Sequence, residues 1–142
     1  DNGWELASHS WGHINFGKRS FEDVKTDSDK WASRVESLIG KTDILLYPFG
    51  SDVGDWHPYT PDNQKYEYLH QLGFRYFCNV DSSQHWVQFG NDYVRQGRRN
   101  LDGYRMYYDL PETDPKKDHL SDLFDVTQIF DRERPVPVAP MS

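Results

Sequence analysis

The sequence predicts an α/β fold with parallel strands, and two kinds of segment carry this prediction. Short apolar runs that resemble strands alternate with longer stretches whose apolar residues have helical spacing. The runs at 43–47 and 74–80 are nearly continuous in apolar residues, which is typical of strands buried on both faces. Strands that alternate with helices are joined by crossovers, and such crossovers make the strands parallel and the connections right-handed.

The first half of the chain supplies most of the predicted elements. Leu6 and Ala7 end a first strand. A helix is predicted from the polar residues 26–29 to Gly40, because the apolar residues between them are spaced i, i+4, i+7 and i+8 (Trp31, Val35, Leu38 and Ile39). After the strand at 43–47 and a polar loop at 51–59, a second helix is predicted to begin at residues 60–61 and to stop at Gly73, since proline is favoured at the first helical position.

The pattern weakens after the strand at 74–80. Loops rich in Asp, Asn and Gly follow, with one strand predicted at 104–108 and a short amphipathic helix at 120–130. Residues 134–140 contain three prolines and predict an extended, polyproline-like segment. We therefore expect one partial domain over residues 1–133 and a Pro-rich tail over 134–142.

Composition excludes several classes of function. The net charge of −7 disfavours nucleic acid or an anionic membrane as the main partner, because both attract positive charge. No apolar run reaches the roughly 18 residues that a membrane-spanning helix needs. The single Cys78 excludes an internal disulfide and is expected to be a core thiol. The basic residues of 95–99 are expected to form a solvated loop or to pair with acidic residues.

Two histidines, His9 and His13, are the most informative pair in the sequence. At positions i and i+4 they would lie about 5–6 Å apart on a helix, but about 13 Å apart on a strand that rises ~3.3 Å per residue. Ser10 and Gly12 favour a turn between them, so the pair can share one divalent metal ion. The alternative is two histidines at this spacing by chance. His9, residues 47–49 and Asp81 all follow predicted strand ends, where parallel α/β folds carry their sites.

Aromatic residues make up 15% of the chain, with five Trp and nine Tyr. They predict either a core built from large side chains or a cleft in which flat rings stack on sugars. Four of them occupy loop-like sequence near the other candidate residues and are expected to line such a cleft: Trp11, Trp56, Tyr59 and Trp86.

The segment around the two histidines resembles a known motif. Residues 3–13, GWELASHSWGH, resemble the metal-binding motif G-x-E-[IL]-[AG]-x-H-[ST]-x-x-H of the polysaccharide deacetylases, also called NodB-like carbohydrate esterases. Residues 44–50, ILLYPFG, resemble the family's R-x-P-[YF]-G segment, and residues 79–86 are similar to its D-x-x-D-W segment with one residue more. The order of the three segments agrees with the family, and the resemblance covers about residues 1–90.

The resemblance implies the latter part of a distorted (β/α) barrel that is incomplete at its N-terminus. It implies a divalent metal, most simply zinc, held by His9 and His13 and by one aspartate. It also implies that the backbone N–H of Phe49 stabilises an oxyanion and that Trp86 lines the pocket for the acyl group or sugar. Tyr47 and Pro48 would belong to the substrate-binding segment, and Asp81 occupies a position that orients an arginine in the family.

The chain departs from the family in several places. The T-F-D-D-G motif, the source of the third metal ligand and of the base, is absent, so we expect this chain to be a portion of a longer protein whose N-terminal part supplies it. Leu46 stands in place of the arginine, and His85 in place of the second aspartate. The late L-x-H motif has no clear counterpart, since His119 does not lie in strand-like sequence.

Three functions remain open from the sequence. The leading prediction is metal-dependent removal of N- or O-acetyl groups from an acetylated polysaccharide or oligosaccharide, by a chain that is inactive as an isolated fragment. A catalytically silent carbohydrate-binding or structural module of the same fold is the second. The third is a two-histidine hydrolase of another kind, with Asp52, Asp55 or His57 as third ligand. The resemblance favours an extracytoplasmic or cell-surface location, and a cytoplasmic one stays open.

Overall fold

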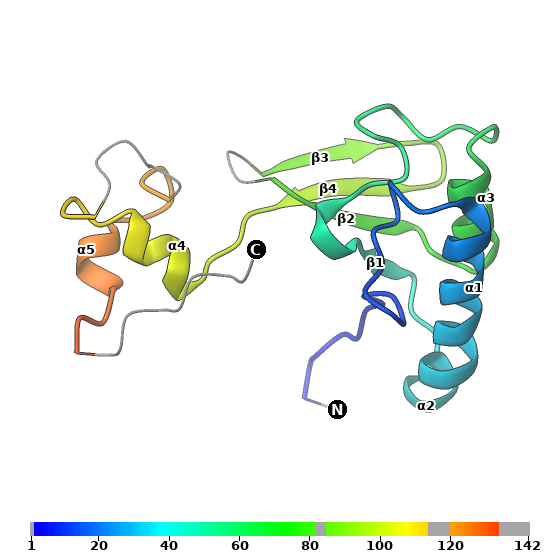
Figure 1. The fold of residues 1–142 in the computed structure, drawn as a ribbon, viewed down its shortest axis with the longest axis horizontal. Coiled ribbons are helices and arrows are strands. Elements are labelled where there is room, and N and C mark those ends of the chain that lie inside the picture. The colour runs from blue at the N-terminus through cyan, green and yellow to red at the C-terminus, as the bar shows by residue number, and fades with distance from the viewer. Residues whose placement is uncertain (1, 82–84, 114–119, 134–142) are drawn as a thin grey trace. The chain divides into compact units, whose positions relative to one another are not determined.

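The computed structural model of the chain describes residues 2–81, 85–113 and 120–133 (Figure 1). By its internal contacts the chain forms two compact units, Asp1–Arg98 and Arg99–Ser142, where the sequence predicts one domain over residues 1–133. The first unit contains the sheet, and within it lie both predicted metal ligands. Along the described residues no helix is both long enough and apolar enough to cross a membrane.

A four-stranded sheet organises the first unit, and the predicted α/β class is confirmed. Its strands are β1 (Ile44–Leu46), β2 (Tyr76–Val80), β3 (Trp86–Phe89) and β4 (Val94–Arg98), in the order β1-β2-β4-β3. β1 pairs with β2 and β2 with β4 in parallel, whereas β3 is antiparallel to β4. The sheet is therefore mixed, which corrects the prediction of parallel strands alone, and as described it does not close into a barrel.

The hairpin of β3 and β4 replaces predicted loops. Gly90 N–H donates to the carbonyl of Tyr93 at 2.8 Å and closes the connection between the two strands. Trp86 lies opposite Gly97 in the register, and its indole covers the glycine so closely that a Cβ at position 97 would overlap the ring. The basic residues of 95–98 thus belong to a strand, and the prediction of a solvated loop is wrong. The alternative of ion-pair partners is confirmed for Arg95 and Arg99, which pair with Asp52 and Asp122.

The first helix begins earlier than predicted. α1 spans Phe21–Trp31, because the Ser20 hydroxyl accepts a hydrogen bond from the N–H of Asp23 at 3.1 Å and caps it. A π-helical stretch, Ala32–Glu36, separates it from the short α2, Ser37–Ile39. The wider turn shifts the helical register, so that Leu38 is 83% exposed although its spacing predicts a buried residue.

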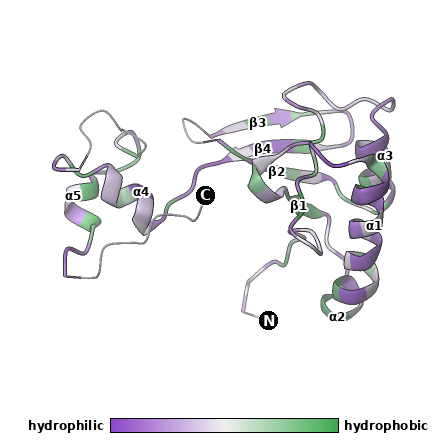
Figure 2. Ribbon diagram, in the orientation of Figure 1, coloured by the Kyte–Doolittle hydropathy of each residue, from purple (hydrophilic) through white to green (hydrophobic). Residues whose placement is uncertain are grey.

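The second helix begins later than predicted. α3 spans Gln64–Gln71, and Asn63 caps it by accepting a hydrogen bond from the N–H of Tyr66 at 3.1 Å. Pro61 lies in the preceding turn. Tyr66 and Leu69 are buried as expected. Figure 2 shows α1 and α3 hydrophilic over most of their length, as expected for helices that bury only one stripe against the sheet.

Aromatic side chains dominate the core of the first unit. Its buried members are Phe16, Val24, Trp31, Leu45, Tyr47, Tyr59, Tyr66, Leu69, Phe74, Phe77 and Tyr93. Cys78 is buried as well, in agreement with the prediction of a core thiol. Eight of the eleven residues in this cluster are aromatic, so the prediction of a core built from large side chains is confirmed for this unit.

The second unit is small. α4 spans Gly103–Tyr108, where the sequence predicts a strand, because the Asp102 carboxylate accepts a hydrogen bond from the N–H of Arg105 at 2.8 Å and starts a helix. Of the helix predicted at 120–130 only α5, Val126–Ile129, is present. The core of this second unit consists of Leu110, Leu120 and Val126. The predicted Pro-rich tail, 134–142, and His119 lie outside the described residues.

Candidate metal site

An isolated bridge to β1 places His9 at the carboxyl end of that strand. Ser8 pairs with Leu45 through a parallel bridge, in which Ser8 N–H donates to the carbonyl of Ile44 at 2.9 Å and Leu46 N–H donates to the carbonyl of Ser8 at 2.8 Å. The bridge is a single residue long, so the predicted first strand is reduced to one point of pairing. This single pair fixes the position at which His9, the next residue, leaves the sheet.

The predicted turn between the two histidines is present. Ser10 and His13 adopt positive φ angles of 69° and 51°. The buried carboxylate of Asp27 in α1 accepts hydrogen bonds from the N–H groups of Trp11 at 2.9 Å and of Gly12 at 2.7 Å. Asp27, one of the polar residues 26–29 at which a helix is predicted to begin, is thus the residue that holds the turn in place.

This turn brings the imidazoles of His9 and His13 together. Their ring centroids are 4.9 Å apart and the ring planes meet at 74°. Two imidazoles bound to one tetrahedral ion at about 2.0–2.1 Å have ring centres about 5 Å apart. Both residues are exposed, so an ion can reach them from solvent.

One hydrogen bond sets the tautomer of His9. Its Nδ1 lies 2.8 Å from the carbonyl oxygen of Leu46. Because a carbonyl only accepts, Nδ1 must carry the proton, and Nε2 then keeps the lone pair that binds a metal. Metal-binding histidines commonly donate their second ring nitrogen to a carbonyl or carboxylate in this way.

Phe49 stands beside His13. Their ring centroids are 4.7 Å apart, and the Phe49 side chain is 70% exposed. Phe49 lies in the short 3-10 turn Pro48–Gly50 with φ of 59°. This turn follows β1 directly and is anchored by Tyr47 N–H, which donates to the carbonyl of Cys78 in β2 at 3.0 Å. The second candidate segment therefore meets the histidine loop at the same edge of the sheet.

The donor set fits a divalent ion in part. Two imidazoles are in place, but within the described residues no group of three or more His, Cys, Asp or Glu side chains could hold a metal. Asp52, one of the alternative third ligands, is buried and already accepts several hydrogen bonds. Asp55 and His57 lie exposed in the same loop.

Asp52 is the centre of a buried polar network that sequence analysis does not find. Its Oδ2 accepts hydrogen bonds from the Tyr59 hydroxyl at 2.9 Å, Asn79 Nδ2 at 2.7 Å and Arg95 Nη1 at 3.3 Å. Tyr47 completes it, with its hydroxyl 3.0 Å from that of Tyr59. Burial raises the pKa of both tyrosines, which keeps their hydroxyls protonated as donors.

The predicted substrate-binding residues separate into two groups. Tyr47, Pro48 and Tyr59 are buried and pack in the interior. Trp11 and Trp56 are exposed by 50% and 65%, and Trp86 is half-buried with its ring centroid 5.9 Å from that of Trp56. Only this second group offers ring surface to a ligand.

Asp81 follows β2 directly and is half-buried, and its N–H donates to the carbonyl of Arg98 at 2.9 Å. Leu46, which stands in place of the arginine in the predicted resemblance, is the last residue of β1. Arg95 of β4 is 2% exposed and pairs with Asp52. The role of Asp81 stays a prediction.

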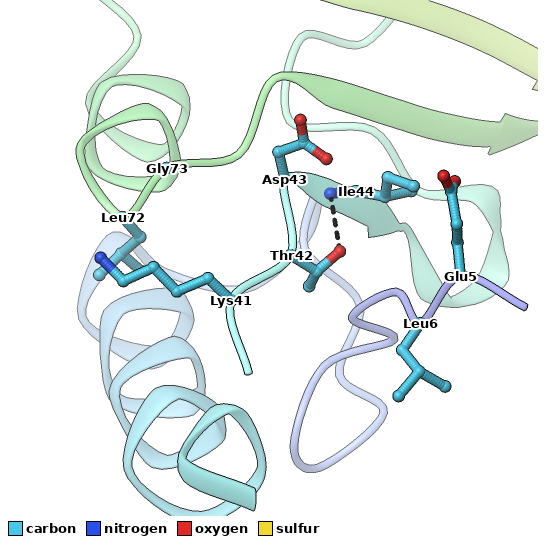
Figure 3. Close-up of a pocket in the computed structure, with 8 residues that line it drawn as sticks. All are labelled: Glu5, Leu6, Lys41, Thr42, Asp43, Ile44, Leu72 and Gly73. Carbon is cyan, nitrogen blue, oxygen red and sulfur yellow. Dashed lines mark hydrogen bonds between the residues drawn. The ribbon is translucent and has the colours of Figure 1, made fainter. Parts of the chain in front are cut away.

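A separate hollow lies at the opposite end of β1 (Figure 3). It has a volume of about 540 Å³ and is lined by Glu5, Leu6, Lys41, Thr42, Asp43, Ile44, Leu72 and Gly73. The dashed line in Figure 3 marks a hydrogen bond at the start of the strand, in which Ile44 N–H donates to the Thr42 hydroxyl at 3.2 Å. Since the histidines lie at the strand's other end, this hollow is distinct from the candidate metal site.

Comparisons of the chain with models of protein families, with curated proteins and with solved structures gave no match.

Proposed function

We propose that this chain is part of a metal-dependent deacetylase of acetylated carbohydrates, in which His9 and His13 are two ligands of a divalent ion, most simply zinc. The observation that carries the proposal is the hydrogen bond from His9 Nδ1 to the Leu46 carbonyl, beside a second imidazole at 4.9 Å. It leaves Nε2 of His9 free to bind a metal, as the corresponding hydrogen bonds of metal-binding histidines do.

Each residue of the site then has a specific task. A bound divalent ion would supply a water of lowered pKa and polarise the acyl carbonyl. Phe49 is proposed to offer its backbone N–H to the oxygen that gains negative charge. Trp11, Trp56 and Trp86 are proposed to hold the sugar rings.

The proposal includes the finer fold and the missing ligand. The open sheet of residues 44–98 is proposed to be the latter part of a distorted (β/α) barrel, completed by sequence outside the 142 residues printed here. The third ligand, an aspartate, is proposed to come from there. Structural and catalytic zinc sites normally have at least three protein ligands. We therefore expect this chain to bind zinc with a Kd weaker than about 1 µM.

Zinc titration tests the proposal. We expect weak one-to-one binding that His9→Ala and His13→Ala each abolish, while the control His70→Gln retains it, because His70 is paired with Asp92 away from the loop. Acetate release from N-acetylglucosamine oligomers and from acetylated xylan is measured with the full-length protein. The proposal fails if zinc binding is indifferent to both site variants, or if the full-length protein with zinc releases no acetate.

One observation favours a second function, a silent carbohydrate-binding module. Within the described residues the two imidazoles have no carboxylate partner for a metal, whereas Trp11 and Trp56 remain exposed for sugar rings. Saccharide binding without zinc-dependent acetate release in the full-length protein would select this alternative.

A further inference from the structure

Arg95 of β4 is a buried cation that no step of the proposed chemistry uses. Its side chain is 2% exposed, and the carboxylate of Asp52 neutralises its charge at 3.3 Å. This pairing leaves most of the guanidinium free for other contacts, because the group is a planar fork with five N–H donors. The other donors and the flat face of the fork contact the loop 51–59 and the indole at the start of β3.

The fork anchors the loop at Trp56. Arg95 Nη2 donates to the carbonyl of Trp56 at 3.3 Å, and Nη1 donates to the carbonyl of His57 at 2.9 Å. Asp55 and Trp56 both have positive φ angles, 44° and 71°, which residues other than glycine rarely adopt. Strained backbone of this kind persists only where the surrounding structure holds it. Without the two bonds from Arg95, we expect this backbone to relax and to turn the Trp56 side chain in a new direction.

The flat face of the same guanidinium holds a second indole. Arg95 Cζ lies 5.6 Å from the ring centroid of Trp86, which is within the range of a cation–π contact. The ring centroids of Trp86 and Trp56 are 5.9 Å apart, and their ring planes are tilted by 49°. One buried group therefore contacts the backbone of the first indole and the ring of the second.

The loop and the histidine turn have other anchors as well. Tyr59 N–H donates to the Tyr93 hydroxyl at 3.0 Å and fixes the end of the loop. The turn between the two histidines is held by Asp27 in α1. Loss of the Arg95 fork is therefore expected to act on the two indoles and to leave the histidines in place.

We propose that Arg95 is a positioning residue, which fixes Trp56 and Trp86 as one preformed surface for a ligand. A surface that is arranged in advance binds more tightly, because fewer side chains must become ordered on binding. That the ligand is the acetylated carbohydrate rests on the proposed function. Arg95 itself is buried and acts only through the two indoles.

Fluorine NMR of the chain labelled with 5-fluorotryptophan tests this inference without any ligand. Each of the five tryptophans gives one signal, and single replacements by phenylalanine assign the signals. The main variant is Arg95→Lys, which retains a cation beside Asp52 but lacks the planar fork. The spectra of the unaltered chain and of this variant are compared well below the unfolding midpoint of each.

The five signals give both the expected change and its internal reference. In Arg95→Lys we expect the Trp56 signal to move towards that of Trp4, whose side chain is 88% exposed. The Trp86 signal should shift as well, because its ring loses the guanidinium face. The signal of Trp31, which is buried in the core, should stay where it is.

Two further variants separate positioning from a general loss of stability. Arg95→Met combined with Asp52→Asn removes the fork together with the charge that it neutralises, and it should move the same two signals. Tyr93→Phe is the matched control, because it removes a hydrogen bond from the end of the same loop. It should leave the Trp56 signal in place. The inference is overturned if neither Arg95 variant moves the Trp56 signal, or if Tyr93→Phe moves it as far.

Kinetics of the full-length protein connect this surface to the proposed function. For zinc-dependent acetate release, Arg95→Lys should raise KM at least about fivefold and leave kcat within about twofold, since lost binding that is common to substrate and transition state changes KM alone. An unchanged KM in a variant whose Trp56 signal has moved would overturn the inference. If the unaltered protein releases no acetate, the proposed function fails, and the fluorine spectra alone decide whether Arg95 positions the indoles.

Discussion

Replacing Asp27 by asparagine is the sharpest test of how the histidine loop is held. Asp27→Asn keeps the shape of the side chain and removes its charge. The carboxylate accepts the N–H groups of Trp11 and Gly12 with its two oxygens, at 2.9 and 2.7 Å. The amide can accept only one of them, and its own NH₂ group then faces the other donor.

The magnitude follows from these two bonds. A hydrogen bond to a charged group contributes about 1.5–3 kcal/mol, and a neutral one about 1 kcal/mol. Asp27→Asn loses one charged bond and weakens the other. Trp11 and Gly12 are themselves exposed, so water can satisfy the released N–H. We therefore expect the free energy of unfolding to fall by about 2 kcal/mol, which is near the lower end of the combined loss from the two hydrogen bonds.

The same change should also affect the metal site. With one bond lost and the other weakened, the segment between the histidines is held less firmly to α1, and we expect the imidazoles to sample wider separations. Zinc affinity is then expected to fall at least about fivefold, since ring positions must be restored on binding. Urea unfolding followed by circular dichroism gives the stability, and calorimetry gives the zinc affinity.

Asp62→Asn is the matched control, because it removes the same charge from an exposed turn residue. It should change stability by no more than about 0.5 kcal/mol. If Asp27→Asn unfolds at the same urea concentration as Asp62→Asn and binds zinc equally well, the loop is not held by Asp27 and the reasoning is refuted.

Three further changes have defined outcomes. Gly50→Ala should lower the free energy of unfolding by about 2 kcal/mol or more. Gly50 has φ of 62°, and a Cβ at this position would lie 3.0 Å from a backbone nitrogen of β2. Urea unfolding equal to that of the unaltered chain would contradict this. Arg95→Met should cost about 3 kcal/mol, since it leaves the buried carboxylate of Asp52 without its cation, and adding Asp52→Asn should recover part of that loss. A double variant no more stable than Arg95→Met alone would show that the pair is not the cause. A hydrogen bond from Lys25 holds the pKa of Asp29 below its ordinary value. The ionised Asp29 therefore stabilises the fold at pH values above its ordinary pKa, and this stabilisation is lost as the pH falls through the lowered pKa of the folded state. An NMR titration should find the Asp29 pKa lowered in the unaltered chain and higher in Lys25→Met, and equal values would contradict the assignment.

The elements around the histidines could be predicted because their signals are local. The β1 run is apolar and ends at Pro48, and the turn at Ser10 follows from small, polar residues that tolerate bending. The meeting of the histidine loop with residues 48–50 also follows, because the carboxyl ends of neighbouring parallel strands lie at one edge of a sheet. These local rules predict that the three residues lie near one another, and the rings of His9, His13 and Phe49 are neighbours in the structure.

What could not be predicted depends on long-range pairing. Residues 86–98 form a hairpin where the sequence predicts loops. Its strands contain polar residues such as Gln88 and Arg95, so they lack the apolar pattern from which strands are predicted. Arg95 is charged yet 2% exposed, because Asp52, 43 residues away in the sequence, compensates it. Spacing along the sequence cannot reveal such a pair. Without the pair, the arrangement of the residues around Trp56 could not be predicted.

NMR of the imidazole nitrogens during zinc titration is the most direct test of the metal site. Long-range nitrogen–proton spectra identify which ring nitrogen of His9 carries the proton. We expect Nδ1 to be protonated, and the Nε2 signal of His9 to move together with a ring nitrogen of His13 as zinc is added. Protonation of His9 at Nε2, or zinc additions that move neither histidine, would contradict the assignment of this pair as metal ligands.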